Sequence, residues 1–113
     1  MRSKFLKMLG GLFHFATLRG IDMVCFTFYR STEDQLKEFD AGRSRTKTGK
    51  HPLWLAVDLA LWDDIDIDQN IDKDEVRWSN DPRYVLLGEF WESIGGTWGG
   101  RWGDPNDPYH FEL

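Results

Sequence analysis

The sequence predicts a single α+β domain in which a small antiparallel sheet is flanked by helices. The chain has 113 residues, which is room for one hydrophobic core, so we expect residues 1–113 to form one domain. Its content of 41% hydrophobic and 15% aromatic residues is typical of a folded globular protein. Apolar residues recur at helical spacing near the N-terminus and again after residue 81, and they alternate at strand spacing in between.

Helices and one strand account for the first half of the chain. Apolar residues three and four apart over residues 5–18 predict an amphipathic helix that ends near Gly20 and covers the sheet. The stretch 23–29 (MVCFTFY) is rich in β-branched and aromatic residues and predicts a buried strand. A second helix is expected over residues 31–42, between capping hydroxyl residues and a closing glycine, and residues 43–50 form a solvated basic loop.

The second half opens with the clearest strand pattern. Strict alternation over residues 53–62 (LWLAVDLALW) places five aliphatic residues on one face and Asp58 in the middle of the other face. An Asp-Pro pair at 81–82 begins a helix that ends at Gly95-Gly96. A loop rich in glycine and tryptophan then leads to a short final strand over residues 109–113.

Between these elements, residues 64–75 carry acidic or amide side chains at positions 1, 3, 5, 7, 9 and 12 of a calcium-binding loop. Gln69 stands at position 6, where such loops need glycine for a sharp turn. The isoleucines of this segment also fit a hairpin with a solvated acidic edge. The sequence leaves both interpretations open.

Charge and cysteine content exclude several function classes. The net charge is −5, with 10 basic and 5 acidic residues over 1–50 but 4 basic and 14 acidic over 51–113. An acidic total argues against nucleic acid as a partner. The single cysteine, Cys25, excludes an internal disulfide and a multi-thiolate zinc site, and its apolar neighbours predict that it packs in the core. No apolar run approaches the roughly 20 residues of a membrane span.

A carboxylate in the middle of a buried strand needs a partner, because burying it alone costs several kcal/mol. For Asp58, His51 and His110 are candidates, and two imidazoles with one carboxylate form a hydrolytic zinc site with a fourth position for water. Asp107 precedes His110 by three residues across an Asp-Pro turn, so both can face one ion, with Asp107 as the base. Glu112 shares a strand face with His110 and either orients that imidazole or is solvated. Histidines at the surface or bonded in the core are the alternative to a metal site.

Two tryptophans of the glycine-rich loop lie close to Asp107 in sequence. Large aromatic residues of small domains are usually buried, which would place Trp98 and Trp102 in the core. They could instead line a groove for a peptide or a sugar.

Three stretches carry a resemblance to a known family. FYRSTEDQ, GRSRTKTGKHPLWLAVDL and LGEFWESIGGTWGGRWGDPNDPYHFEL resemble the zinc D-alanyl-D-alanine carboxypeptidases and L-alanyl-D-glutamate endopeptidases (VanY-like), especially small phage endolysins. The family often has Ser two residues before the first histidine and Gly three residues after it, where this chain has Gly49 and Trp54. These two departures affect the expectation of which peptide bond is cleaved, but not the expectation that a metal is bound. The resemblance implies the α+β fold of the hedgehog and D-Ala-D-Ala peptidase type.

The resemblance also implies a role for each matching residue. His51, Asp58 and His110 would bind zinc as the cofactor, and Asp107 would be the general acid and base. Arg30 would stabilise the developing oxyanion or hold the substrate.

From this resemblance we expect a zinc peptidase that cleaves the stem peptides of bacterial peptidoglycan, as an L-alanyl-D-glutamate endopeptidase. The alternatives are a D-alanyl-D-alanine carboxypeptidase, or a non-catalytic wall-binding or structural module that retains the metal. We expect a monomeric phage endolysin that gathers in the cytoplasm of the bacterial host and acts on the cell wall after release.

Overall fold

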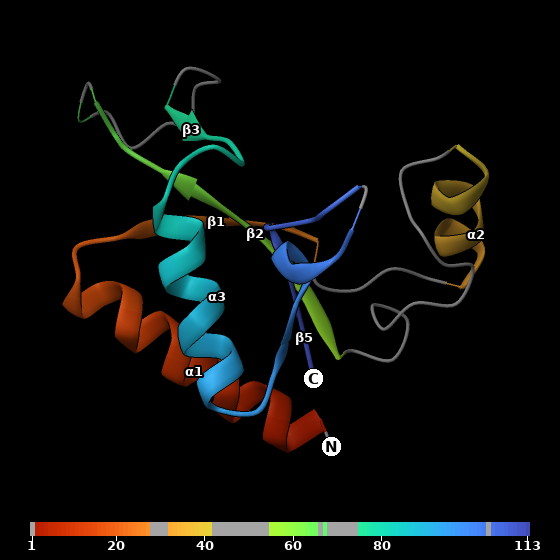
Figure 1. The fold of residues 1–113 in the computed structure, drawn as a ribbon, viewed down its shortest axis with the longest axis horizontal. Coiled ribbons are helices and arrows are strands. Elements are labelled where there is room, and N and C mark those ends of the chain that lie inside the picture. Colours follow the sequence, from red (N-terminus) through yellow and green to blue (C-terminus); the bar gives the residue numbers. More distant parts are fainter. Residues whose placement is uncertain (1, 28–31, 42–54, 66, 68–74, 104) are drawn as a thin grey trace.

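A five-stranded antiparallel sheet forms the centre of the computed structural model, which describes residues 2–27, 32–41, 55–65, 67, 75–103 and 105–113 (Figure 1). The strand order is β1-β2-β5-β4, and β3 pairs with β2 beyond the end of β5. The strands are β1 (Asp22–Thr27), β2 (Ala56–Trp62), β3 (Val76–Arg77), β4 (Thr97–Trp98) and β5 (His110–Glu112). With the helices described next, this sheet confirms the predicted α+β class.

Two helices pack against each other and against one face of the sheet. They are α1 (Arg2–Leu18) and α3 (Arg83–Ser93), and both contribute buried side chains to the core. Edge-to-face ring contacts of Trp91 with Phe5 and Phe111 connect α3 to α1 and to β5. The remaining helix, α2 (Thr32–Asp40), lies apart from this layer in Figure 1. Among the described residues, no helix has the length and apolar character of a membrane span.

The ends of α1 and α3 follow the predicted signals. Gly20 adopts a φ of 68° just after α1, a conformation that is strained for residues with a side chain. At the start of α3 the backbone N–H of Arg83 donates to Asp81 Oδ1 at 2.9 Å, which makes Asp81 the capping side chain. Gly95, with a φ of 101°, ends α3 as predicted.

The alternation in β2 is confirmed over the residues that the structure describes. Leu55, Val57, Leu59 and Leu61 are buried in the core under the helices. The opposite face carries Asp58, and its neighbours Ala56 and Ala60 are fully buried. Both faces of β2 are therefore covered, so Asp58 lies in a mostly enclosed environment.

A buried strand was predicted over residues 23–29; over 23–27 the strand forms but is not buried, and residues 28 and 29 lie outside the described residues. Among the strands that the structure describes, β1 lies at the edge of the sheet and pairs with β2 alone, and it carries a bulge between Cys25 and Thr27. Cys25 is exposed, so its predicted place in the core was also wrong, and the Phe26 side chain next to it is 53% exposed. Hydropathy alone cannot distinguish an edge strand from a central one, because both are rich in apolar residues.

A hairpin-type pairing closes the acidic segment at its two ends. β2 pairs with β3 in antiparallel register, with Trp62 opposite Val76. The adjacent Glu75 is buried, and its Oε2 accepts a hydrogen bond of 2.9 Å from the backbone N–H of Ile65. The ends of the segment therefore follow the hairpin interpretation, while positions 3, 5, 7 and 9 of the candidate calcium loop lie outside the described residues.

Candidate metal centre

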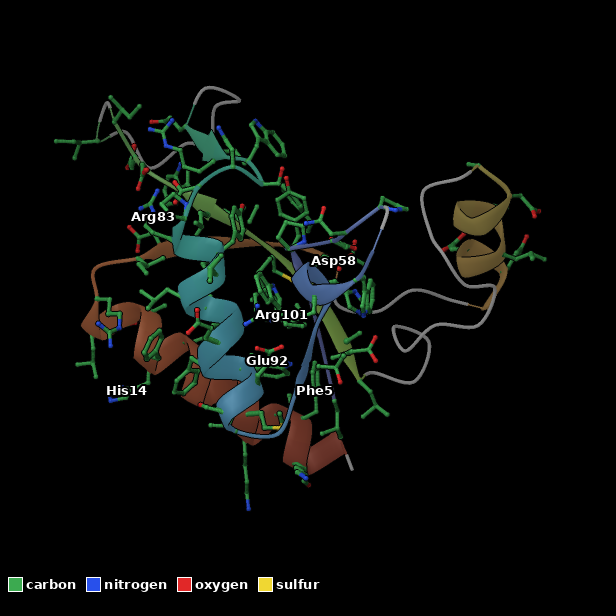
Figure 2. All side chains as sticks on the ribbon, viewed as in Figure 1. Phe5, His14, Asp58, Arg83, Glu92 and Arg101 are labelled. Carbon is green, nitrogen blue, oxygen red and sulfur yellow. The ribbon has the colours of Figure 1, made fainter. Side chains whose placement is uncertain are left out.

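The pairing of β2 with β5 places Asp58 directly opposite His110. Opposed residues of an antiparallel pair share a face, so their side chains can meet although they are 52 residues apart in the chain. His110 Nδ1 lies 3.0 Å from Asp58 Oδ1. In Figure 2 Asp58 appears near the blue segment that contains the short 3₁₀ helix η2 (Gly99–Arg101).

A second carboxylate contacts the other nitrogen of the same ring. His110 Nε2 lies 2.8 Å from Glu112 Oε1, and the Glu112 side chain is only 16% exposed. Of the two interpretations of Glu112, contact with the imidazole is the one observed.

His110 is 8% exposed and lies in a strongly anionic environment. Burial, the largest influence, lowers the pKa of His110, but the hydrogen bonds to Asp58 and then Glu112 outweigh it and raise the pKa to about 9. The negative charges of Asp58 and Asp107 act in the same direction. Without a cation, this imidazole is therefore protonated at neutral pH.

Asp107 joins the pair from the turn that leads into β5. The backbone N–H of His110 donates to the Asp107 carbonyl at 3.1 Å, which closes the turn that the Asp-Pro dipeptide predicted. Ligand atoms of Asp58, Asp107 and His110 all lie within 4.8 Å of one another. The structure thus brings together three of the five predicted site residues, whereas His51 and Arg30 lie outside the described residues.

Gly99 supports the position of Asp107, although no pattern in the sequence distinguishes it from its neighbouring glycines. The backbone N–H of Asp107 donates to the Gly99 carbonyl at 2.9 Å. A Cβ atom at residue 99 would lie 2.4 Å from the Asp107 carbonyl oxygen and 3.0 Å from His110 Cβ. Only glycine allows η2 to approach this closely. The glycine-rich loop was the available signal, but it did not indicate which glycine is required.

The two loop tryptophans have different roles. Trp98 is 4% exposed and donates from Nε1 to the Pro108 carbonyl at 2.8 Å, so it belongs to the core and not to a groove. The Trp102 ring is half-buried and lies 5.0 Å, centroid to centroid, from the His110 ring. Trp102 is therefore the tryptophan that borders the candidate metal centre.

The donor atoms fit a zinc ion by type and by spacing. Zinc bonds of about 2.0–2.1 Å in a tetrahedron separate neighbouring ligand atoms by about 3.3 Å. The observed 3.0 Å between His110 Nδ1 and Asp58 Oδ1 is close to that value. One imidazole and carboxylate oxygens are ligands that zinc accepts, and Asp107 lies near enough to hold a water or act on one.

Comparison with known proteins places this site in a family. The sequence model of the D-alanyl-D-alanine carboxypeptidase family matches residues 42–113, which include Asp58, Asp107 and His110. No curated protein matches the chain at a significant level.

Several solved structures share the fold. The L-Ala D-Glu endopeptidase ChiX of Serratia marcescens is 25% identical, with a TM-score of 0.59 over 82% of this chain and 67% of that chain. The D,D-pentapeptidase VanY of a VanB-type vancomycin resistance cassette, in complex with Zn(II), is 21% identical, with a TM-score of 0.56 over 96% and 70%. VanYB in complex with D-Alanine-D-Alanine is 21% identical, with a TM-score of 0.57 over 96% and 68%.

The family match spans more than half of the chain and agrees with the resemblance that the motifs predicted. The fold that the chain shares with ChiX and VanY is consistent with this family. The chain belongs to the D-alanyl-D-alanine carboxypeptidase family.

Proposed function

We propose that the protein is a zinc-dependent peptidase that hydrolyses the stem peptides of bacterial peptidoglycan. The observation that carries this proposal is the meeting of Asp58, Asp107 and His110 within 4.8 Å, because Asp58 of β2 is distant in sequence from the turn and strand β5 that carry the other two. The family supports peptidase activity, and the similar VanY structure contains Zn(II).

In this proposal Asp58 and His110 hold the metal together with His51. A zinc ion held there would supply Lewis-acid chemistry and make water a stronger acid near neutral pH. Asp107 takes the proton from the attacking water and returns it to the leaving amine, which is general base and then general acid catalysis. Arg30 is assigned to the negative charge that develops on the carbonyl oxygen.

Asp107 suits the role of base better than Glu112. The carboxylate of Glu112 is hydrogen-bonded to Nε2 of His110, whereas the Asp58 contact is at Nδ1 on the opposite side of that ring. Asp107 is the carboxylate that groups with Asp58 and His110 at a distance suited to a shared cation.

For the bond that is cleaved, we propose the L-alanyl-D-glutamate bond. The likeness to ChiX, an L-Ala D-Glu endopeptidase, favours it. Removal of a terminal D-alanine is the second candidate, which the family description and the D-Alanine-D-Alanine complex of VanYB favour. Digestion of purified muropeptides followed by mass spectrometry distinguishes internal cleavage, loss of one alanine, and the absence of product expected of a non-catalytic module.

The Asp107→Ala variant tests the assignment of the base. We expect it to retain zinc while kcat/KM on muropeptides falls by about 10²–10⁴, the usual contribution of general acid–base catalysis. Asp40→Ala, which removes an exposed aspartate of α2, is the matched control and should behave like the wild type. Full activity of Asp107→Ala would remove Asp107 from the mechanism, and loss of its zinc would make Asp107 a ligand.

We also propose, from the resemblance alone, that the protein is a phage endolysin that collects in the host cytoplasm. Its expression inside bacteria should leave the cells intact until the membrane is permeabilised, after which turbidity should fall rapidly. Lysis without permeabilisation would contradict this location.

A further inference from the structure

We infer that Glu112 is a positioning residue that holds the Nε2–H of His110 and thereby directs the Nδ1 lone pair at the metal. This inference rests on the proposed zinc site and adds a residue to it. The role of Glu112 is to select the tautomer and the ring orientation of a ligand, not to bind the metal or the substrate.

The contacts of the His110 ring carry the inference. Each ring nitrogen faces a different carboxylate, with Asp58 Oδ1 at 3.0 Å from Nδ1 and Glu112 Oε1 at 2.8 Å from Nε2. The cluster that can share a cation contains Asp58 and Asp107, and Glu112 is not in it. The metal is therefore expected on the Nδ1 side of the His110 ring, and Glu112 contacts the opposite, Nε2 side.

The chemistry of imidazole makes the two positions unequal. A neutral imidazole has one N–H donor and one lone pair, and a carboxylate can only accept. Once Nδ1 gives its lone pair to a metal, Nε2 must carry the proton, and this Nε2–H donates a hydrogen bond to Glu112 Oε1. A carboxylate in this place fixes the ring and raises the basicity of the ligating nitrogen.

The fold holds Glu112 where this role needs it. Spacing by two residues along β5 puts Glu112 and His110 on the same face. In the β2–β5 pair, Glu112 lies opposite Ala56, whose small side chain leaves room for the Glu112 carboxylate. The backbone of β5 is anchored on both sides, because Trp91 Nε1 donates to the Glu112 carbonyl at 2.9 Å and Leu113 N–H donates to the Leu55 carbonyl at 3.0 Å.

Zinc affinity, measured by competition with a chromophoric chelator, is the first test. We expect Glu112→Ala to bind zinc about 10–100-fold more weakly than the wild type, the range found for the loss of such a partner. Glu112→Gln should recover part of that loss, because its amide oxygen can still accept from Nε2–H. Glu89→Ala removes an exposed glutamate of α3 and should bind zinc as the wild type does.

Long-range ¹⁵N NMR correlation spectra of the zinc-loaded wild type are the second test, and they do not depend on activity or on the folding of a variant. His110 should show a metal-bound Nδ1 and a protonated Nε2. That proton should exchange with water faster in Glu112→Gln, where the acceptor is uncharged and weaker.

The outcomes separate this inference from the proposed function. Zinc bound through Nε2 of His110, or unchanged affinity in folded Glu112→Ala, overturns the role of Glu112 and leaves the zinc peptidase standing. A wild-type chain that binds no zinc overturns both.

Discussion

At the scale of single residues, the candidate site depends on one position where a side chain cannot be accommodated. Gly99 brings η2 against the turn that carries Asp107, and an added Cβ would meet the Asp107 backbone at 2.4 Å. Backbone cannot yield as a flexible side chain can, so the turn itself would have to move. Since a shift of about 1 Å in a catalytic group can cost about 10²-fold in rate, we expect Gly99 to matter for the proposed activity through its contact with the Asp107 turn.

We predict that Gly99→Ala lowers kcat/KM on muropeptides by about 10–100-fold, because it displaces Asp107 from the attacking water. The control is Gly103→Ala, in the same loop, where an added Cβ would meet no atom within 4 Å. Steady-state kinetics of both variants, with circular dichroism to verify their folding, is the measurement. Equal activity of the two would show that the loop absorbs the extra methyl group.

At the scale of elements, one side chain connects α3 to two strands. The Tyr84 hydroxyl accepts a hydrogen bond of 2.9 Å from the Leu61 backbone N–H of β2 and donates to the Arg77 carbonyl of β3. Burial raises the pKa of Tyr84 to about 12, so the hydroxyl keeps its proton for this donation. The hydroxyl thus satisfies backbone groups of both strands in a buried place, which makes its loss costly.

We predict that Tyr84→Phe lowers the free energy of unfolding by about 1–3 kcal/mol, the cost of leaving a buried backbone group without its partner. Urea unfolding followed by tryptophan fluorescence measures it. Tyr109→Phe is the matched control, because it removes the hydroxyl of the tyrosine whose ring packs edge-to-face against Tyr84. A similar midpoint for the two variants would mean that water replaces the Tyr84 hydroxyl.

At the scale of the whole molecule, an ion-pair network holds the end of the sheet opposite to the candidate site. Asp63, just beyond β2, accepts hydrogen bonds from Arg77 of β3 at 2.8 Å and from Arg83 of α3 at 2.9 Å. Arg83, labelled at the start of α3 in Figure 2, also binds Asp81. The hydrogen bonds from Arg83 and then Arg77 lower the pKa of Asp63 to about 2.

This pKa sets the direction of an acid effect on stability. Because the folded pKa of about 2 is below the unfolded value of about 3.9, the stabilisation is complete above about pH 4 and is lost as the pH falls toward 2. We predict that the urea midpoint of Asp63→Asn changes less than that of the wild type between pH 4 and pH 2. The Asp63 side chain is 37% exposed, so the difference should shrink in high salt. An equal change in urea midpoint between pH 4 and pH 2 for the wild type and Asp63→Asn would contradict the prediction.

Several elements could be predicted from the sequence because their signals are local. The periodicity of α1, the alternation of β2 and the glycine that ends α3 each depend on residues within a few positions of one another. The predicted burial of β1 was wrong for the opposite reason, since whether a strand has one neighbour or two is decided by residues elsewhere in the chain. Cys25 was misplaced with it.

For the site, the residue types and spacings alone determined that His51, Asp58, Asp107 and His110 were candidates for one centre, because a buried carboxylate requires a partner. Only the tertiary structure decided that His110 lies between Asp58 and Glu112, and that Gly99 supports Asp107. The physical reason is that strand register and close backbone approach come from the packing of the whole chain. Contacts between residues far apart in sequence leave no periodic signal in it.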